Sequence, residues 1–182
     1  MAASFYAAAA PAVQAATKGT VLFPSVVLAQ MALESRLGKS RLSAEYHNFF
    51  GHKASSKWKG RKVSFATPND AKKVSQFRVY GSNTEGIRAH VAILSGPLYR
   101  RAQAAGDPYA QVRALAATYA EDRSYADKLV AIMQQQNLTQ YDAHQTGPGL
   151  LALALLGTAA AYHYRTQLTR TAARFTRLLT TR

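Results

Sequence analysis

The helical periodicity of apolar residues in this 182-residue chain is interrupted once, between residues 42 and 80, and this interruption does most to limit the possible folds. Within it, glycine and proline residues break the pattern, and two short stretches, 63–65 and 77–79, alternate apolar and polar side chains. Alternation with a period of two is typical of strands that bury one face. The sequence therefore predicts a small antiparallel hairpin inserted into a mostly helical domain.

Helices are predicted on both sides of this insertion by apolar residues three and four positions apart and by capping residues at their starts. Ser82 and Glu85 have the spacing of a capping box. Asp107 followed by Pro108 suits an N-cap and a first helical position. The predicted helices cover residues 1–17, 22–40, 82–95, 108–119 and 124–136.

The second of these helices carries a single carboxylate, Glu34, near its end. Val27, Met31 and Glu34 fall at i, i+4 and i+7, which places the acid on the apolar side of the helix. Burial and the negative end of the helix dipole both disfavour the ionised form, so we expect the pKa of this carboxyl to be raised. A carboxyl that stays protonated near neutral pH can act as a general acid. The alternative is a solvated residue of the last turn with no chemical role.

The chain is strongly basic, with 23 Lys and Arg residues against 9 Asp and Glu residues and a net charge of +14. This excess predicts a polyanionic partner, and charge alone does not choose between nucleic acid, anionic lipid and an acidic cell-wall polymer. The absence of cysteine excludes disulfides and thiolate metal sites. The five histidines lack the spacing of metal ligands, and no Gly-rich phosphate loop or G-x-S-x-G turn occurs. We therefore expect no metal and no cofactor.

The last part of the chain differs in composition, since residues 147–182 contain five Arg residues and no acid. Residues 150–164 within it are almost entirely apolar. A helix of that length spans roughly 22 Å, less than the ~30 Å of a bilayer core. We predict a short membrane span with a basic flank, and the alternative is a core or interfacial helix. The predicted organisation is a first domain at 1–142, a linker at 143–149 and a hydrophobic, membrane-associated helix with a basic tail at 150–182.

Four stretches of the chain occur in the order typical of one known family: PSVVLAQMALESRLGKS at 24–40, HNFFGHK at 47–53, FRVYGSNTEGIRAHVAIL at 77–94 and YAEDRSYADKLVAIM at 119–133. On these motifs the chain resembles the glucosaminidase domain of glycoside hydrolase family 73, as found in flagellar peptidoglycan hydrolases. The resemblance implies a mainly α (α+β) fold, namely a lysozyme-like helical domain with a small antiparallel β-lobe. It also implies hydrolysis of the β-1,4 bond after N-acetylglucosamine in peptidoglycan, which is endo-β-N-acetylglucosaminidase activity.

The resemblance assigns roles to residues only where the motifs match. Glu34 matches the family's catalytic acid. Tyr80 is added as an aromatic residue able to stack on a sugar face, although packing explains it equally well. The other positions expected to bind substrate are Asn48, Phe49, Gly51, Tyr119 and Tyr125.

One position departs from the family's pattern. Many members carry a second glutamate in the β-lobe shortly before the FRxY motif, whereas this chain has Thr67-Pro68-Asn69-Asp70 there. Three explanations stay open: Asp70 is the second catalytic carboxylate, the substrate's own acetamido group takes its place, or activity is lost.

The expected partner is the glycan strand of peptidoglycan, with an anionic membrane surface as a further partner of the C-terminal segment and no nucleic acid. The residues before Lys18 lack the charged start of a signal peptide. The expected location is nevertheless the cell wall or periplasm, or the membrane. Two rival functions stay open: a nucleic-acid-binding module, suggested by clustered Lys and Arg at 53–73, and a catalytically impaired wall-binding or membrane-associated cationic protein.

Overall fold

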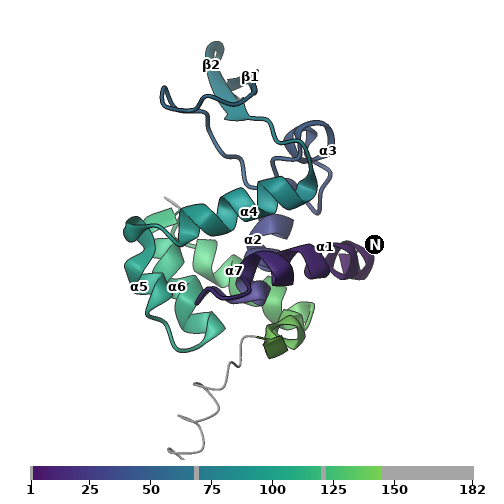
Figure 1. The fold of residues 1–182 in the computed structure, drawn as a ribbon, viewed down its shortest axis with the longest axis vertical. Coiled ribbons are helices and arrows are strands. Elements are labelled where there is room, and N and C mark those ends of the chain that lie inside the picture. Colours follow the sequence, from purple (N-terminus) through teal and green to yellow (C-terminus); the bar gives the residue numbers. More distant parts are fainter. Residues whose placement is uncertain (1, 68–69, 120–121, 145–182) are drawn as a thin grey trace, which may run out of the picture. The chain divides into compact units, whose positions relative to one another are not determined.

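Helices make up most of the residues that the computed structural model describes, which are 2–67, 70–119 and 122–144 (Figure 1). The elements are α1 (Ala2–Thr17), α2 (Pro24–Ser35), α3 (Arg41–Tyr46), β1 (Lys62–Thr67), β2 (Asp70–Arg78), α4 (Asn83–Leu94), η1 (Pro97–Tyr99), α5 (Arg100–Gln103), α6 (Pro108–Tyr119), α7 (Tyr125–Gln135) and η2 (Leu138–His144). A mostly helical domain with one small antiparallel sheet is therefore confirmed. The linker predicted at 143–149 falls almost wholly outside the described residues, and the hydrophobic helix predicted at 150–164 falls wholly outside them.

Helix α2 lies at the centre of the helical part and packs against α1, α6, α7 and η2. Ten of its twelve residues are buried, including the consecutive run Val26, Val27 and Leu28. The prediction of one apolar face is wrong, because neighbouring helices surround this helix on nearly all sides. An apolar run with no polar face is typical of such a buried helix. Glu34 sits in the last turn, as predicted.

The two ends of α2 are held in different ways. At its start, Asp142 accepts hydrogen bonds from the backbone N–H of Ser25 at 2.8 Å and from its hydroxyl at 2.7 Å. At its end, the backbone turns into the left-handed region at Arg36 (φ 54°) and Leu37 (φ 57°). The sequence had suggested an end at Ser40, but the helix ends at Ser35.

A short helix, α3, follows where the sequence predicted that helical structure is lost. The hydroxyl of Ser40 accepts a hydrogen bond from the backbone N–H of Ser43 at 3.2 Å and so caps its start. The prediction failed here because six residues are too few to show a helical period. The turn between α2 and α3 places Ser40 on the wall of the pocket that Glu34 also lines, described below.

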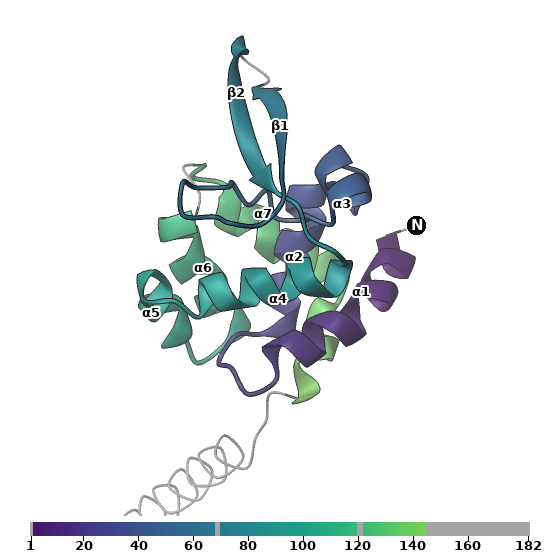
Figure 2. The same cartoon turned by 45° about the horizontal axis from the view of Figure 1, so that its top comes forward.

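Strands β1 and β2 form an antiparallel hairpin that stands off the helices (Figure 2). Val63 pairs with Phe77 and Phe65 pairs with Ser75, which confirms the predicted hairpin. Strand β2 is longer than predicted and begins at Asp70. The other predicted starts are also observed: Ser82 accepts from the N–H of Glu85, and Asp107 accepts from the N–H groups that follow Pro108.

The buried core joins residues from the helical elements other than α3, with Leu28, Leu94, Leu115 and Leu129 among its fully buried side chains. Within the described ranges, every helix is too short or too polar to cross a bilayer.

Candidate active site

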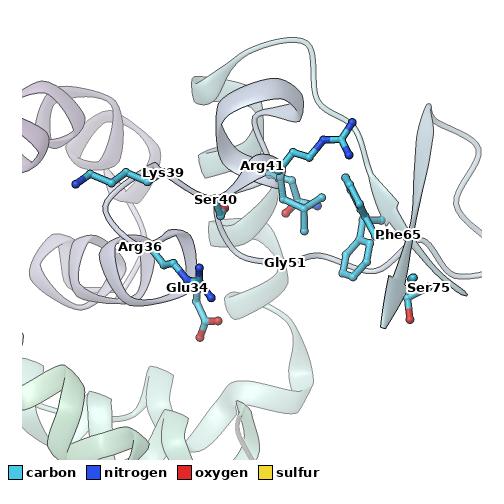
Figure 3. A pocket seen from close by; sticks show the side chains of 12 residues that line it. Glu34, Arg36, Lys39, Ser40, Arg41, Gly51, Phe65 and Ser75 are labelled. Carbon is cyan, nitrogen blue, oxygen red and sulfur yellow. The ribbon is translucent and has the colours of Figure 1, made fainter. Parts of the chain in front are cut away.

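A pocket of about 530 Å³ lies between the end of α2, the turn into α3 and the base of the hairpin. Figure 3 shows Glu34 and Arg36 on one side of it and Phe65 and Ser75 of the hairpin on the other. This volume is within the usual range for sites that bind small molecules or segments of polymers. The residues that line it are Glu34, Arg36, Lys39, Ser40, Arg41, Leu42, Asn48, Gly51, Phe65, Ala66, Ser75 and Phe77.

Glu34 reaches this pocket from the last turn of α2 and is exposed to solvent there. The surrounding protein removes part of its hydration, and this desolvation raises the pKa of its carboxyl above the ordinary value of 4.5. The hydroxyl of Tyr125 donates a hydrogen bond to Oε1 at 2.9 Å, which lowers the pKa by a smaller amount. The balance favours a carboxyl that keeps its proton at a higher pH than an exposed glutamate does.

The other charged residues of the pocket rim are basic. Arg36, Lys39 and Arg41 all line it, and Glu34 is the one acid among its described lining residues. Arg41 also pairs with the exposed Glu45 at 3.0 Å, an i,i+4 contact on α3. The pocket therefore offers one acid to a bound molecule within a field of positive charge, which favours anionic ligands.

Asn48 and Gly51, both predicted site residues, line the pocket. Asn48 is 1% exposed, and its side-chain amide donates to the carbonyls of His52 at 3.0 Å and Arg78 at 2.9 Å. Its carbonyl oxygen accepts from the N–H of His52 at 2.9 Å. Gly51 has a φ of 65°, and a Cβ there would meet only open space, so backbone conformation explains the glycine. Asn48 thus ties the loop at 48–52 to the end of β2.

Replacing Asn48 with alanine removes all three of these buried hydrogen bonds. We expect the free energy of unfolding to fall by about 3 kcal/mol, since the partner groups are left without donors and acceptors. Urea unfolding followed by circular dichroism measures this loss. The matched control is Asn83→Ala, at an exposed asparagine with one bond to His47, which should change stability by less than about 0.5 kcal/mol. A loss at Asn48 as small as the control's would contradict this role.

Two of the predicted aromatic residues, Phe49 and Tyr80, are not among the residues that line the pocket. Phe49 is 6% exposed and packs in the core, where it lines a separate hollow with Phe5. Tyr80 is 3% exposed and forms a hydrogen bond with His52 at 2.8 Å. For both, the described contacts are packing and internal hydrogen bonds.

Tyr119 and Tyr125 stack on one another with ring centroids 5.7 Å apart. Tyr125 contacts Glu34 directly, whereas the hydroxyl of Tyr119 donates to the carbonyl of Phe50 at 3.4 Å. Tyr125 is therefore the predicted tyrosine with a direct connection to the acid.

Asp70 begins β2 and is paired across the hairpin with Thr67. Its side chain lies outside what the structure describes. Ser75, which lines the pocket, is five residues further along the strand, so the backbone of Asp70 lies ~17 Å from Ser75 along the strand. Its role as a second carboxylate stays a prediction.

Three buried polar residues behind Glu34 were not singled out from the sequence: Gln30, His52 and His90. Gln30 precedes Glu34 by four residues on α2. Residues four apart lie on the same side of a helix, so the sequence alone places Gln30 on the side that carries Glu34. The two histidines come from distant segments, and no local pattern joins them to the acid. Among the described residues, no group of three His, Asp or Glu side chains is placed to hold a metal ion.

Comparisons with known proteins agree on one family. The family model for glucosaminidase, described as mannosyl-glycoprotein endo-beta-N-acetylglucosaminidase, matches residues 10–138. A probable N-acetylmuramidase of Lactococcus lactis subsp. cremoris strain MG1363 is 37% identical over 135 residues, which cover 66% of this chain and 30% of that protein. The peptidoglycan hydrolase FlgJ of Escherichia coli strain K12 is 38% identical over 121 residues, covering 60% of this chain and 39% of FlgJ.

Solved structures show the same likeness. The catalytic domain of the autolysin Auto from Listeria monocytogenes superposes with a TM-score of 0.67 at 32% identity, covering 76% of this chain and 86% of that domain. The curated relatives are longer proteins, and this chain spans less than half of the length of the two compared above.

Proposed function

Because this chain belongs to the glucosaminidase family, we propose that it is a peptidoglycan hydrolase that cleaves the β-1,4 bond after N-acetylglucosamine, with Glu34 as general acid. The observation that carries the proposal is the setting of Glu34. It is a partly desolvated carboxyl with a raised pKa, hydrogen-bonded by Tyr125, on the wall of a pocket between α2 and the hairpin. Its direct test is cleavage of purified cell walls, followed as loss of turbidity.

In the proposed reaction, Glu34 donates its proton to the glycosidic oxygen as the bond to the anomeric carbon breaks. The electron pair of that bond leaves with the oxygen, and positive charge develops on the sugar ring. The raised pKa keeps the proton on Glu34 at a higher pH than an exposed glutamate permits. Because only the protonated form can donate, the rate should fall as pH rises through this pKa.

The basic rim supports a cell-wall substrate. Peptidoglycan carries carboxylates on its peptide stems, and Arg36, Lys39 and Arg41 lie where a strand in the pocket would bring them close. Attraction between exposed charges weakens with added salt, because ions screen them beyond about 10 Å at 0.1 M. The proposed location is therefore the cell wall or periplasm, where this polymer is found.

The bond specificity is part of the proposal. The family description refers to N-acetylglucosaminidase activity, while one relative is called a probable N-acetylmuramidase. The two activities leave different sugars at the new reducing end, so the products of digestion distinguish them.

A second group must stabilise the developing charge or activate water. The candidates are Asp70, at the far end of the hairpin, and the 2-acetamido carbonyl of the substrate itself. The backbone of Asp70 lies ~17 Å along β2 from Ser75, the nearest residue of that strand on the pocket wall, which supports the acetamido group.

The variant Asp70→Asn separates these two candidates. If the acetamido group acts, the variant should keep its rate of wall digestion within about threefold of wild type, since no carboxylate is needed there. A loss of about 10²-fold or more would instead assign the second role to Asp70, because general acid–base groups contribute that much. Turbidity assays at fixed pH measure either outcome, and Asp107→Asn, an exposed cap on α6, is the control for removing one negative charge.

A further inference from the structure

Behind Glu34, a chain of hydrogen bonds runs into the core. Tyr125 contacts Oε1 of Glu34 at 2.9 Å, and Nε2 of Gln30 contacts the hydroxyl of Tyr125 at 3.3 Å. The other end of the same amide, Oε1 of Gln30, lies 3.2 Å from Nε2 of His90. Gln30 and His90 are fully buried, so water does not replace these partners.

The chain continues through a second histidine. Nδ1 of His90 lies 3.0 Å from Nε2 of His52, and Nδ1 of His52 lies 2.8 Å from the hydroxyl of Tyr80. Both imidazoles stack on Phe50, with centroids 3.7 Å apart for His90 and 5.6 Å apart for His52. These ring contacts fix the planes of the two histidines and hence the directions of their nitrogens.

When Glu34 is ionised, its charge determines the direction of every hydrogen bond in this series. A carboxylate only accepts, so Tyr125 must donate to it and must accept from the amide nitrogen of Gln30. The amide oxygen of Gln30 then faces His90, and His90 must carry its proton on Nε2. If the amide of Gln30 were flipped, its oxygen would face the hydroxyl oxygen of Tyr125, and neither atom could donate to the other.

The directions of the remaining hydrogen bonds follow from the protonation of the two histidines. Burial lowers the pKa of His90 well below 6.5 and that of His52 to about 4, so both imidazoles are neutral at neutral pH. A neutral imidazole has one donor and one acceptor. Nδ1 of His90 therefore accepts from Nε2–H of His52, and Nδ1 of His52 accepts from Tyr80. All the donors point toward Glu34.

We propose that Gln30, His90 and His52 are positioning residues that hold the hydroxyl of Tyr125 on Oε1 of Glu34, so that the acid proton is carried by Oε2. This inference rests on the proposed function of Glu34 and adds to it. Oε1 is occupied as an acceptor, and Oε2 has no hydrogen bond from the described residues. The chain does not relay protons, because the neutral amide of Gln30 interrupts it.

The other groups around Glu34 do not fix the direction of this hydroxyl. Tyr119 stacks on the ring of Tyr125, and its interaction with Glu34 is limited to the effect of the negative charge of the carboxylate. The cations of the rim face the same pocket and can attract either oxygen of the carboxylate. The charged or titratable groups that surround Glu34 are Tyr119, Tyr125, Arg36, Lys39 and Arg41.

The first test requires no substitution and no activity. Nitrogen-15 spectra of the side chains of the wild-type protein report which imidazole nitrogen carries the proton. We expect His52 and His90 both to be neutral at pH 7 with the proton on Nε2. A proton on Nδ1 of either ring would overturn the one-way chain.

The second test measures the pKa of Glu34 directly, by carbon-13 titration of glutamate carboxyls. Only four glutamates occur in the chain, so the signals can be assigned: Glu34, Glu45, Glu85 and Glu121. Tyr125→Phe removes a hydrogen bond to the carboxylate and should raise this pKa by about one pH unit. Gln30→Met keeps the size of the side chain but leaves the hydroxyl of Tyr125 free to turn, and should raise the pKa by about half as much.

The double variant decides whether Gln30 acts through Tyr125. If it does, Gln30→Met adds no further rise to that of Tyr125→Phe, because the intermediate group is gone. Additive shifts would overturn the proposal. The matched control is Gln111→Met, at another fully buried glutamine that bonds to backbone groups away from the pocket. It should lower stability and leave the pKa of Glu34 unchanged.

Activity separates this inference from the proposed function. In wall digestion, Gln30→Met should lower kcat, leave KM unchanged and move the high-pH limb of the rate profile upward together with the pKa. If the wild type fails to cleave walls while the tautomers and pKa shifts are as expected, the proposed function fails and the positioning of Glu34 stands. If walls are cleaved but the high-pH limb of the rate profile does not move in Gln30→Met, the positioning role is overturned.

Discussion

Glu34→Gln is expected to lower the rate of cell-wall digestion by about 10²–10⁴-fold, the usual contribution of a positioned general acid. Glutamine has nearly the same shape, and its side-chain oxygen can still accept from Tyr125. What it lacks is a proton acidic enough to transfer to the glycosidic oxygen. Loss of turbidity of purified walls, measured with equal amounts of wild type and variant, gives the ratio of rates.

Stability supplies the control for this variant. Because the pKa of Glu34 is raised in the folded protein, folding favours the protonated form over the ionised one. The free energy of unfolding should then fall as pH rises from the ordinary glutamate value of 4.5 through the folded pKa. Glutamine is not ionised, so the variant should be at least as stable as wild type at neutral pH. If the variant is inactive but as stable as wild type, the result supports a catalytic role. If it is inactive because it is unfolded, the loss of activity is explained by the loss of structure.

Gly86→Ala is expected to be strongly destabilising. A Cβ at Gly86 would lie 2.2 Å from the backbone carbonyl oxygen of His47 and 3.3 Å from the ring of Tyr80. Alanine favours a helix over glycine by about 1 kcal/mol, but a clash with backbone cannot be relieved by a side-chain rotation. We expect a net loss of at least about 3 kcal/mol and a fall in Tm of roughly 10 °C.

The matched control is Gly106→Ala. A Cβ at Gly106 meets nothing within 4 Å, and this residue lies outside the helices. The substitution should be neutral or raise stability by about 0.5 kcal/mol, because alanine restricts the unfolded chain. Thermal unfolding followed by circular dichroism compares the two. Equal Tm values for Gly86→Ala and wild type would show that α4 is free to move away from the turn at His47.

Most of the helices could be predicted because their signals are local. Ser82 and Asp107 cap α4 and α6 as their spacing indicated. The hairpin was also predictable, since the alternation of apolar and polar residues at 63–65 and 77–79 falls on or next to its two paired strands. Each of these patterns lies within about a dozen residues of sequence, which is the range over which propensity and periodicity operate.

The end of α2 could not be predicted by the same rules. Gly38 was the natural residue for the left-handed turn that ends a helix, yet Arg36 and Leu37 also take positive φ values, which cost non-glycine residues energy. The tertiary environment overrides that cost, since Ser35 closes the turn by accepting from the N–H of Gly38 at 2.7 Å. This early end places Arg36 on the rim of the pocket.

The site was predictable where a motif carried it and not where the fold assembled it. Glu34 and Asn48 were found through their motifs, and both line the pocket. The bonds from Gln30 to His90 and from His90 to His52 join residues 60 and 38 positions apart. Such contacts depend on how helices pack, and no pattern in a single sequence reports them.

The most direct measurement of the central claim is the chemistry of the cut ends. Purified peptidoglycan is digested with wild type or Glu34→Gln, the new ends are reduced with borohydride, and the fragments are identified by mass spectrometry. We expect reduced N-acetylglucosamine at the new ends with wild type and almost none with the variant. Reduced muramic acid with wild type, or undiminished N-acetylglucosamine ends with Glu34→Gln, would contradict the account.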